Sequence, residues 1–305
     1  MKLNNLLPEI GCNEFLLENE RSFETLSLCA DTLDVPACVF IEDAKYIESI
    51  PPNATMIIAS DKVEKTLLQG SYGLCFVPNP RIVFFKLHNY LSQREGYMRR
   101  KVKTEIGANC RISPMSSIAE YNVKIGNGVV IEEFVVIREN TVIGDRGIIR
   151  AGSIIGGQGF EFKRDGFGII AVEHCGGVII GDDVEIQYNN CIDRALYPWD
   201  DTVIGSMTKT DNLTYIAHGV KIESGVLIAA GSSITGRTRI KGNSWIGTGA
   251  TVSNGLTIGE NARVSIGSVV TKNVPDNQTV TGNFAIPHDK FMENLKISFR
   301  GLRGL

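Results

Sequence analysis

An aliphatic residue recurs at every sixth position over long stretches of this 305-residue chain. The first block has isoleucine at six consecutive positions of this spacing, from Ile125 to Ile155. The second block begins at Ile180 and extends to Val270, and only Pro198 and Thr210 interrupt its aliphatic positions. Neither the two-residue alternation of a strand nor the 3.6-residue period of a helix produces this spacing. A fixed repeat of this kind predicts a solenoid.

A second position of the repeat carries a compact side chain. Four residues after most of the aliphatic positions the chain has a small or β-branched residue, as at Val220, Ser232 and Ala250. Short strands joined by tight corners would stack one aliphatic side chain per strand into a continuous apolar core. Glycines mark many of the expected corners.

Three segments carry a family resemblance: Ile125-Gly126-Asn127-Gly128, Ile143-Gly144-Asp145 and Ile258-Gly259-Glu260-Asn261. They resemble the hexapeptide repeats of left-handed parallel β-helix acyltransferases. In that family three hexapeptides make one turn of a triangular coil, so residues 18 apart lie in one column. The left hand is an implication of the resemblance, because the spacing itself does not define a hand and most crossovers are right-handed.

The repeat also predicts where the β-helix lies in the chain. Its phase shifts between Ile155 and Ile180, and the glycine-rich residues 156–177 are expected to leave the coil as a loop insertion. The six-residue register is absent before residue 104. We therefore assign the β-helix to residues 104–286.

The remaining residues predict two smaller parts. Residues 1–103 are expected to form a small α/β domain, with strands at Thr55–Ala59 and Leu74–Pro78 and a helix at Arg81–Leu91. Residues 287–305 are moderately basic and are expected to form a short C-terminal helix or tail. The predicted fold class is mainly β, a left-handed parallel β-helix preceded by an α/β domain.

Composition excludes several classes of function. The formal net charge is −3, and basic residues gather only at 99–103, so a nucleic-acid partner is not expected. No stretch approaches the ~20 apolar residues that a transmembrane helix needs, and we expect a cytoplasmic protein. Seven scattered cysteines form neither a zinc motif nor a disulfide framework, which favours reduced thiols and no bound metal.

Of four histidines, His218 is the candidate for chemistry. It follows an inward-pointing Ile216 by two residues and is expected near a corner of the coil. For His88, His174 and His288 a solvated or capping role is the expected one.

The sequence around His218 carries a more specific resemblance. The segments Ile192-Asp193-Arg194, Asp200–Gly205, Asp211-Asn212 and Ile216-Ala217-His218 resemble the UDP-3-O-acylglucosamine N-acyltransferases of lipid A synthesis. The resemblance implies that His218 is the general base. It further implies that Gly236, eighteen residues on, supplies the oxyanion amide, and that Asp211 and Asn212 orient His218 or the sugar.

The chemistry fits these residue types. An amine that attacks a thioester must lose a proton as the tetrahedral intermediate forms, and an imidazole that titrates near neutrality can accept it. The oxyanion then needs a hydrogen-bond donor, and a glycine lets the acyl carbon approach the backbone closely.

The same resemblance extends to the first domain. The segment from Phe40 to Tyr46 is similar to the uridine-binding Phe-x-x-Asn-x-x-Tyr of those enzymes, which implies that Phe40 and Tyr46 flank the base. Asp43 stands where an asparagine is expected; its carboxylate can accept from the ring N–H but cannot donate to a carbonyl. UDP is therefore the expected nucleotide, and another pyrimidine nucleotide such as dTDP remains open.

The acyl donor is left open between two alternatives. The family has a second histidine after an Asn-Gly pair, whereas Asn254-Gly255 is followed here by Leu256, and the C-terminal tail is shorter than in enzymes that receive acyl carrier protein. The segment Gly267–Pro275 instead resembles the last coil of acetyl-CoA-dependent sugar acetyltransferases, which implies that Lys272 holds CoA phosphates. Acyl-CoA is slightly favoured over acyl carrier protein.

The sequence thus predicts an N-acyltransferase of a nucleotide-linked amino sugar, acting in lipid A or envelope glycan synthesis as a homotrimer, with no bound cofactor. The nearest alternative is the hydroxyacyl-carrier-dependent UDP-3-O-acylglucosamine N-acyltransferase itself. An O-acyltransferase differs only in the nucleophile. An alternative of another class is an inactive β-helix subunit that binds sugar nucleotides or serves as a scaffold.

Overall fold

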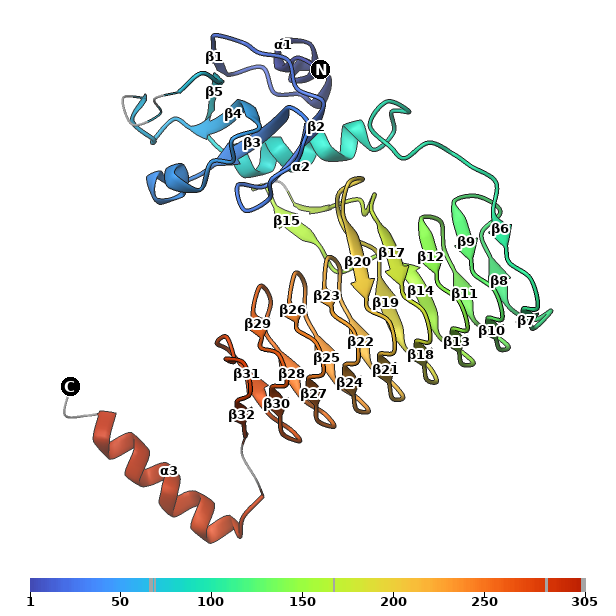
Figure 1. Ribbon diagram of the computed structural model, residues 1–305. Coiled ribbons are helices and arrows are strands. Elements are labelled where there is room, and N and C mark those ends of the chain that lie inside the picture. Colours follow the sequence, from blue (N-terminus) through green and yellow to red (C-terminus); the bar gives the residue numbers. More distant parts are fainter. Residues whose placement is uncertain (66–67, 69, 167, 283–284, 303–305) are drawn as a thin grey trace.

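The structure is a computed structural model that describes the chain except residues 66–67, 69, 167, 283–284 and 303–305 (Figure 1). A small α/β domain lies against the side of a long parallel β-helix, and a C-terminal helix extends beyond the last coil. Within the described residues, no helix combines the length and the apolar character needed to cross a bilayer.

The N-terminal domain is built on a five-stranded sheet with the order β1-β5-β4-β3-β2. Strand β1 is antiparallel to its neighbour, and the other pairs are parallel. The expected strands at 55–59 and 74–78 and the helix at 81–91 are confirmed as β4, β5 and α2. The elements of this domain are α1 (Leu3–Leu6), η1 (Pro8–Ile10), β1 (Leu16–Glu18), β2 (Thr25–Leu26), β3 (Ala37–Ile41), η2 (Ala44–Ser49), β4 (Ala54–Ser60), β5 (Gly73–Val77) and α2 (Pro80–Leu91).

Helix α2 begins with strong local signals. Asn79 is its N-cap and accepts a hydrogen bond from the Ile82 amide, and Pro80 occupies the first turn, where its missing N–H costs nothing. One face of the helix, with Phe84 and Leu87, is buried in the core of the domain.

The β-helix consists of three parallel sheets whose strands follow one another in turn, as the six-residue repeat predicts. The first sheet contains β7 (Arg111–Ile112), β10 (Val130–Ile131), β13 (Ile148–Ile149), β18 (Glu185–Ile186), β21 (Lys209–Thr210), β24 (Leu227–Ile228), β27 (Trp245–Ile246), β30 (Arg263–Val264) and β32 (Thr279–Val280). The second contains β8 (Ser117–Ile118), β11 (Val136–Ile137), β14 (Ile154–Gly157), β19 (Cys191–Asp193), β22 (Tyr215–Ile216), β25 (Ser233–Ile234), β28 (Thr251–Val252) and β31 (Val269–Val270). The third contains β6 (Glu105–Ile106), β9 (Val123–Ile125), β12 (Thr141–Ile143), β17 (Gly177–Ile180), β20 (Asp201–Ile204), β23 (Lys221–Ile222), β26 (Arg239–Ile240) and β29 (Thr257–Ile258).

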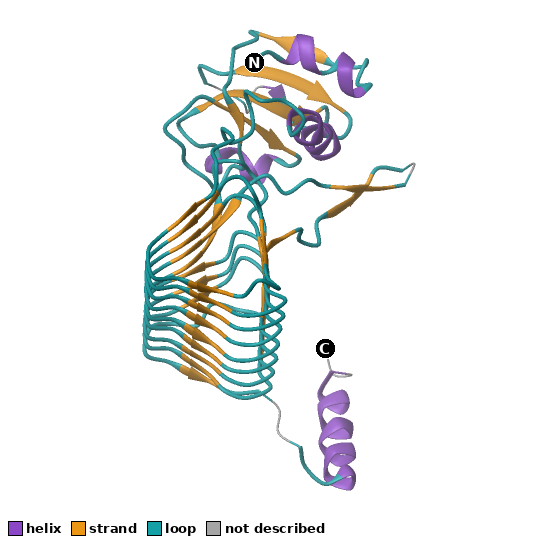
Figure 2. Ribbon diagram, turned by 90° about the vertical axis from the view of Figure 1, so that its right-hand side faces the viewer, coloured by secondary structure: helices purple, strands orange, loops and turns teal. Residues whose placement is uncertain are grey.

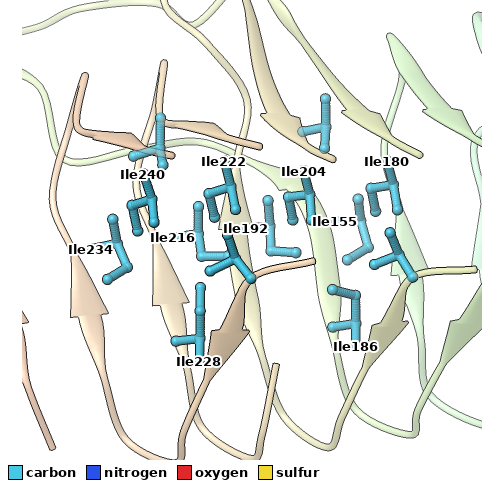
Figure 3. Close-up of a cluster of buried hydrophobic side chains, with 14 of the residues drawn as sticks. Ile155, Ile180, Ile186, Ile192, Ile204, Ile216, Ile222, Ile228, Ile234 and Ile240 are labelled. Atoms are coloured by element: carbon cyan, nitrogen blue, oxygen red, sulfur yellow. The ribbon is translucent and has the colours of Figure 1, made fainter. Parts of the chain in front are cut away.

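The strand register confirms the 18-residue column. Ile216 pairs with Ile234, and Ile234 pairs with Val252 in the next coil. The isoleucines stack inside the prism with almost no exposed surface (Figure 3). Each buried strand position thus contributes apolar area to one continuous core, at about 25 cal/mol per Å² removed from water.

The two interruptions of the repeat have different structural meanings. Thr210 keeps its place in the stack, since it is buried and pairs with Ile228. Pro198 lies outside the stack, because residues 194–200 leave the coil between β19 and β20 and add one repeat length to that turn. Successive partners are accordingly 24 residues apart here, as in the pair Ile192 and Ile216.

The glycine-rich residues between β14 and β17 also leave the coil. They form an antiparallel hairpin, β15 (Phe162–Arg164) and β16 (Ile169–Ala171), that projects from the prism near the N-terminal domain (Figure 2). The last element, α3 (His288–Leu302), follows the final coil.

Both excursions hold the N-terminal domain on the coil. Val172, Leu196 and Tyr197 belong to the same buried cluster as the core of the first domain. Tyr197 stacks on Trp199 with ring centroids 5.2 Å apart, and the Trp199 indole N–H donates to the Leu26 carbonyl at 2.9 Å. The N-terminal domain therefore packs on the coil by burying apolar side chains from both excursions.

Candidate active site

A cleft of about 830 Å³ opens where three parts of the chain meet. The N-terminal domain contributes one wall, the hairpin insertion a second, and one corner of the β-helix the floor. The lining residues that concern the argument below are Phe40, Arg81, Glu161, Lys163, Asp200, His218, Gly236, Arg237 and Arg239.

His218 and Gly236 form the floor of the cleft. His218 sits at the corner after β22, and Gly236 occupies the same corner one coil further on, after β25. A Cβ added at position 236 would lie 2.8 Å from Nε2 and 3.0 Å from Cε1 of His218. The structure thus brings together the two residues that the sequence pairs at a spacing of eighteen, with the Nε2 edge of the ring over the glycine backbone.

The backbone at Gly236 has a free donor. In the part of the chain that the structure describes, its amide N–H has no hydrogen-bond acceptor, whereas the neighbouring Arg237 amide donates to the His218 carbonyl. A free N–H beside an imidazole nitrogen is the arrangement that an oxyanion hole and a general base require.

The groups around His218 shift its pKa in opposite directions. Burial lowers the pKa of His218 from its ordinary value, and Arg237 lowers it further, while the carboxylates of Glu161 and Asp200 raise it. The nearest of these groups is Glu161, whose Oε2 lies 3.5 Å from Nε2 of His218. Because the net direction is downward, the ring is neutral near pH 7 and can accept a proton.

A second layer of titratable groups lies behind His218. The ring of His174 is 5.4 Å from that of His218 and meets it edge-on. Burial lowers the pKa of His174 to about 3, and burial raises the pKa of Asp193 to about 6 even though the Tyr215 hydroxyl donates to its Oδ2 at 2.7 Å. Gly159 passes this layer so closely that a Cβ there would lie 2.7 Å from Nε2 of His174.

The cleft carries more positive than negative charge. Five cationic side chains line it, from Arg81, Lys163, Lys221, Arg237 and Arg239, against the carboxylates of Asp31, Glu161 and Asp200. Arg237 is held by Asp31 of the N-terminal domain at 2.6 Å, which ties the two walls together next to Gly236. An excess of guanidinium and ammonium groups favours an anionic ligand such as a nucleotide.

Among the residues expected to bind the nucleotide, the structure places only Phe40 in the cleft lining. Its ring packs on Phe84 with centroids 4.8 Å apart. Asp43 is the N-cap of η2, where it accepts from the Lys45 amide, and Tyr46 is 45% exposed beside the Lys45 ammonium. Roles for Asp43 and Tyr46 in nucleotide binding stay predictions.

The structure corrects one part of the expectation for Asp211 and Asn212. They lie at the corner between β21 and β22, which is not the corner of His218. Asp211 accepts from the Asn212 amide, and Asn212 accepts from the Tyr188 amide. Within one chain they do not orient His218, because three corners of a triangular coil point away from each other; a role toward the sugar stays a prediction.

Lys272 lies apart from the cleft in the turn after β31, near the open end of the coil, and is exposed. This position does not test its expected role in donor binding, which stays a prediction. Metal-ligating side chains do not cluster in any group of three or more across the described residues.

Sequence reasoning missed the residues that surround His218. The expectation of a solvated or capping role is wrong for His174, which is buried beside His218, and for His88, which bonds the Tyr97 hydroxyl and the Glu173 carbonyl. Glu161 and Lys163 were not singled out, since they belong to the insertion and lie outside the repeat. A local signal was the glycines at 156, 157 and 159, which indicate a close backbone approach.

Comparison with known proteins finds similarity to sugar acyltransferases. The family described as bacterial transferase hexapeptide (six repeats) matches residues 122–157 and 201–236. UDP-3-O-acylglucosamine N-acyltransferase of Coxiella burnetii is 34% identical over 218 residues, which is 60% of this chain and 60% of the relative. The enzyme named UDP-3-O-acylglucosamine N-acyltransferase 2 of Legionella pneumophila is 46% identical over 86 residues, 28% of this chain and 24% of its own length.

A solved structure, that of UDP-N-acetylglucosamine acyltransferase from Arabidopsis, superposes with a TM-score of 0.53 at 26% identity, over 59% of this chain and 62% of that one. The chain therefore spans less than two thirds of the length of the relatives named above. On the repeat, the coil and these similarities, the chain is similar to the bacterial hexapeptide-repeat transferases and, among them, to the UDP-3-O-acylglucosamine N-acyltransferases.

Proposed function

We propose that this protein transfers an acyl group from a thioester to the amino group of a nucleotide-linked amino sugar, in lipid A or envelope glycan synthesis. The observation that carries the proposal is the position of the His218 ring, whose Nε2 edge lies over Gly236 inside a cleft walled by the first domain. The relatives are named UDP-3-O-acylglucosamine N-acyltransferases, and this name supports the same substrate class.

In the proposed reaction, His218 takes the proton that the amine loses as it attacks the thioester carbonyl. The oxyanion accepts a hydrogen bond from the free Gly236 N–H. The imidazolium then returns the proton to the departing thiolate. Both interactions are stronger in the transition state than in the ground state. A positioned general base raises the reaction rate by roughly 10²–10⁴-fold.

The first domain is proposed to hold the nucleotide at its wall of the cleft. Phe40 contributes an aromatic ring to this wall, and Arg81 contributes a guanidinium group. The ion pair between Arg81 and Glu42 is long, at 3.8 Å. Arg239 adds an exposed cation on the coil side. Aromatic and guanidinium groups on facing walls suit a base at one end and a diphosphate at the other. UDP is the proposed nucleotide.

For the donor we propose acyl-CoA, with acyl carrier protein as the alternative. The exposed ammonium of Lys272 near the open end of the coil is available for a CoA phosphate. A lone lysine binds a phosphate as a point charge and has no bidentate geometry to satisfy.

The test is mass spectrometry of the products formed from a panel of amino-sugar nucleotides, each offered acyl-CoA and acylated carrier protein. An N-acylated nucleotide sugar supports the proposal, and its mass also identifies the acyl chain. A product acylated only on oxygen contradicts the amine assignment. Binding of the nucleotide sugar without any thiol release identifies instead the inactive, sugar-nucleotide-binding subunit.

A further inference from the structure

Glu161 presents a carboxylate to the reactive edge of the candidate base. It stands at the start of the hairpin insertion, is about four-fifths buried, and its Oε2 lies 3.5 Å from Nε2 of His218. Nε2 is also the ring atom nearest to the space above Gly236. Glu161 is therefore on the substrate side of the ring, whereas a carboxylate that only orients a catalytic histidine bonds the opposite nitrogen.

The two facing atoms are both acceptors in the active form of the site. A histidine that acts as a base through Nε2 has a lone pair there, and an ionised carboxylate offers lone pairs alone. Lys163 pairs with the other oxygen of Glu161, so Oε2 is the oxygen that faces the base. The cleft thus contains an unmatched pair of acceptors that a ligand with at least two N–H donors would satisfy.

We propose that Glu161 holds the acceptor's amino group as an ammonium ion beside His218, and that it thereby selects amine acceptors over hydroxyl acceptors. The inference rests on the proposed function and adds the residue that decides its substrate class. An ammonium donates to Glu161 and to His218 at the same time, whereas a hydroxyl has one proton and satisfies one acceptor. A charge-assisted hydrogen bond also exceeds a neutral one in strength.

The proton balance of the step is complete. The ammonium first releases one proton through Glu161 to solvent, and the freed nitrogen lone pair attacks the thioester carbonyl carbon. The new N–C bond forms as the carbonyl electron pair moves to the oxygen that faces the Gly236 N–H. His218 takes a second proton from nitrogen, the C–S bond breaks, and the leaving thiolate receives that proton. The products are an amide, a thiol and one proton in solution.

A neighbouring cation reduces the net charge at Glu161. The Lys163 ammonium, which lies 4.6 Å from the centroid of the Phe85 ring, partly neutralises the carboxylate. Glu161 therefore keeps one oxygen for the substrate and one for the protein.

The experiment compares a matched pair of acceptors, UDP-3-O-acylglucosamine and its analogue with a hydroxyl in place of the amine. Binding of each is measured by calorimetry without a donor, for the wild type, for Glu161→Gln and for the control Glu173→Gln. Glu173 lies in the same insertion but outside the cleft lining, and contacts Gln158 at 3.3 Å. Thermal unfolding of each variant checks that the fold is kept.

We expect the wild type and Glu173→Gln to bind the amine about tenfold to a hundredfold more tightly than the hydroxyl analogue, the range of a hydrogen bond to a charged group. Glu161→Gln should lose this preference by weaker amine binding, with a raised KM and an unchanged affinity for the analogue. An unchanged preference in Glu161→Gln overturns the inference. So does an equal fall in kcat for both acceptors with intact binding, since that result assigns Glu161 to positioning His218.

Failure of the proposed function has a different signature. In that case the wild type forms no product with either donor, whatever its binding preference. A preference for the amine that depends on Glu161 would still support the ammonium site, because calorimetry reads it without catalysis.

Discussion

The imidazole of His218 occupies the space into which a side chain at position 236 would project. A Cβ at that position would lie 2.8 Å from Nε2, so a side chain at 236 would displace the His218 ring from its present position. This proximity follows from the coil geometry, which places residues 18 apart at one corner of successive turns. The glycine at position 236 thus reflects the short distance between its coil and the coil of His218.

Replacement of His218 by alanine is expected to lower turnover by two to four orders of magnitude, the usual worth of a general base. Its melting temperature should stay near that of the wild type, because the ring lies at a corner and outside the buried isoleucine stack. Calorimetric melting and steady-state rates are measured on the same preparation. Loss of the fold, or a rate close to that of the wild type, would show that the base is another group.

The imidazole of His218 is expected to titrate below the ordinary histidine pKa of 6.5, since burial is the largest influence on it. A base works in its neutral form, so activity should persist below pH 6.5 before it falls. Glu161→Gln removes a charge that raises this pKa, and the titration should move to a still lower pH. NMR titration of the labelled His218 ring measures both. A midpoint above 6.5, or an upward move in the variant, contradicts the electrostatic account.

Lys272→Ala is expected to raise the KM for acyl-CoA several-fold with little change in kcat, because a phosphate contact remote from the reacting carbon contributes to binding and not to chemistry. Added salt should weaken donor binding more in the wild type than in the variant. Matched acyl chains on CoA and on carrier protein are compared by kcat/KM. A preference of a hundredfold or more for the carrier, about 2.7 kcal/mol at the transition state, would assign the donor to carrier protein.

At the scale of elements, two excursions from the coil build the site. The hairpin supplies Glu161 and Lys163, and residues 194–200 supply Tyr197 and Trp199, which anchor the first domain. Helix α2 completes the contact, since its His88 bonds the Glu173 carbonyl at 2.8 Å and its Asn89 bonds the Ala171 carbonyl at 2.7 Å. The cleft therefore exists only while these elements stay docked.

His88 makes this docking sensitive to acid. Burial lowers its pKa to about 4, against 6.5 in the unfolded chain. The unfolded state binds more protons below pH 6.5, so the stability that neutral His88 provides is present above pH 6.5 and is lost as the pH falls toward about 4. We expect the free energy of unfolding to fall by about 2 kcal/mol between pH 7 and pH 5 from this group.

The measurement is urea unfolding, followed by tryptophan fluorescence, of the wild type and His88→Gln at both pH values. The variant cannot gain a proton at position 88, and its stability should fall less on acidification. His174 titrates in the same direction and is present in both proteins, so the difference between them isolates His88. Equal losses in the two proteins would exclude His88 as the acid-sensitive group.

At the scale of the molecule, one edge of the prism, between the first and second sheets, carries exposed apolar side chains, which we call the ridge. Met115 and Phe134 lie on successive coils of this edge, and Leu213 and Tyr188 lie on two coils further along it. Exposed apolar side chains that gather along one edge favour a contact surface. Asp211 and Asn212 belong to the same corner, so a second copy that packs there would bring them toward a neighbouring cleft.

We therefore expect a homotrimer, in which three equivalent ridges are covered by closed rotational symmetry. Light scattering should give about three times the chain mass of 33.3 kDa. Leu213→Asp should shift the protein toward monomer and lower activity, while Lys241→Asp, at a corner outside the ridge, should not. A stable and active monomer would contradict a site shared between copies.

The repeat is the part of the structure that the sequence determined by itself. Each hexapeptide obeys the same local rule, an aliphatic residue inside and a tight corner after it, so the coil could be predicted from spacing. Its 18-residue columns and the pairing of His218 with Gly236 followed from the family resemblance. The strands and the helix of the first domain followed from hydrophobic patterning in the same way.

Only the tertiary structure decided what surrounds the base. Glu161, His174 and Asp193 lie in or beside segments without periodicity, and their positions depend on where the hairpin folds back and where the first domain docks. The separation of Asp211 from His218 within one chain has the same origin, because neighbours in sequence can occupy different corners of a coil. Local repeats propagate through nearest-neighbour contacts, whereas a cleft between domains depends on contacts between residues far apart in the chain, which carry no common spacing.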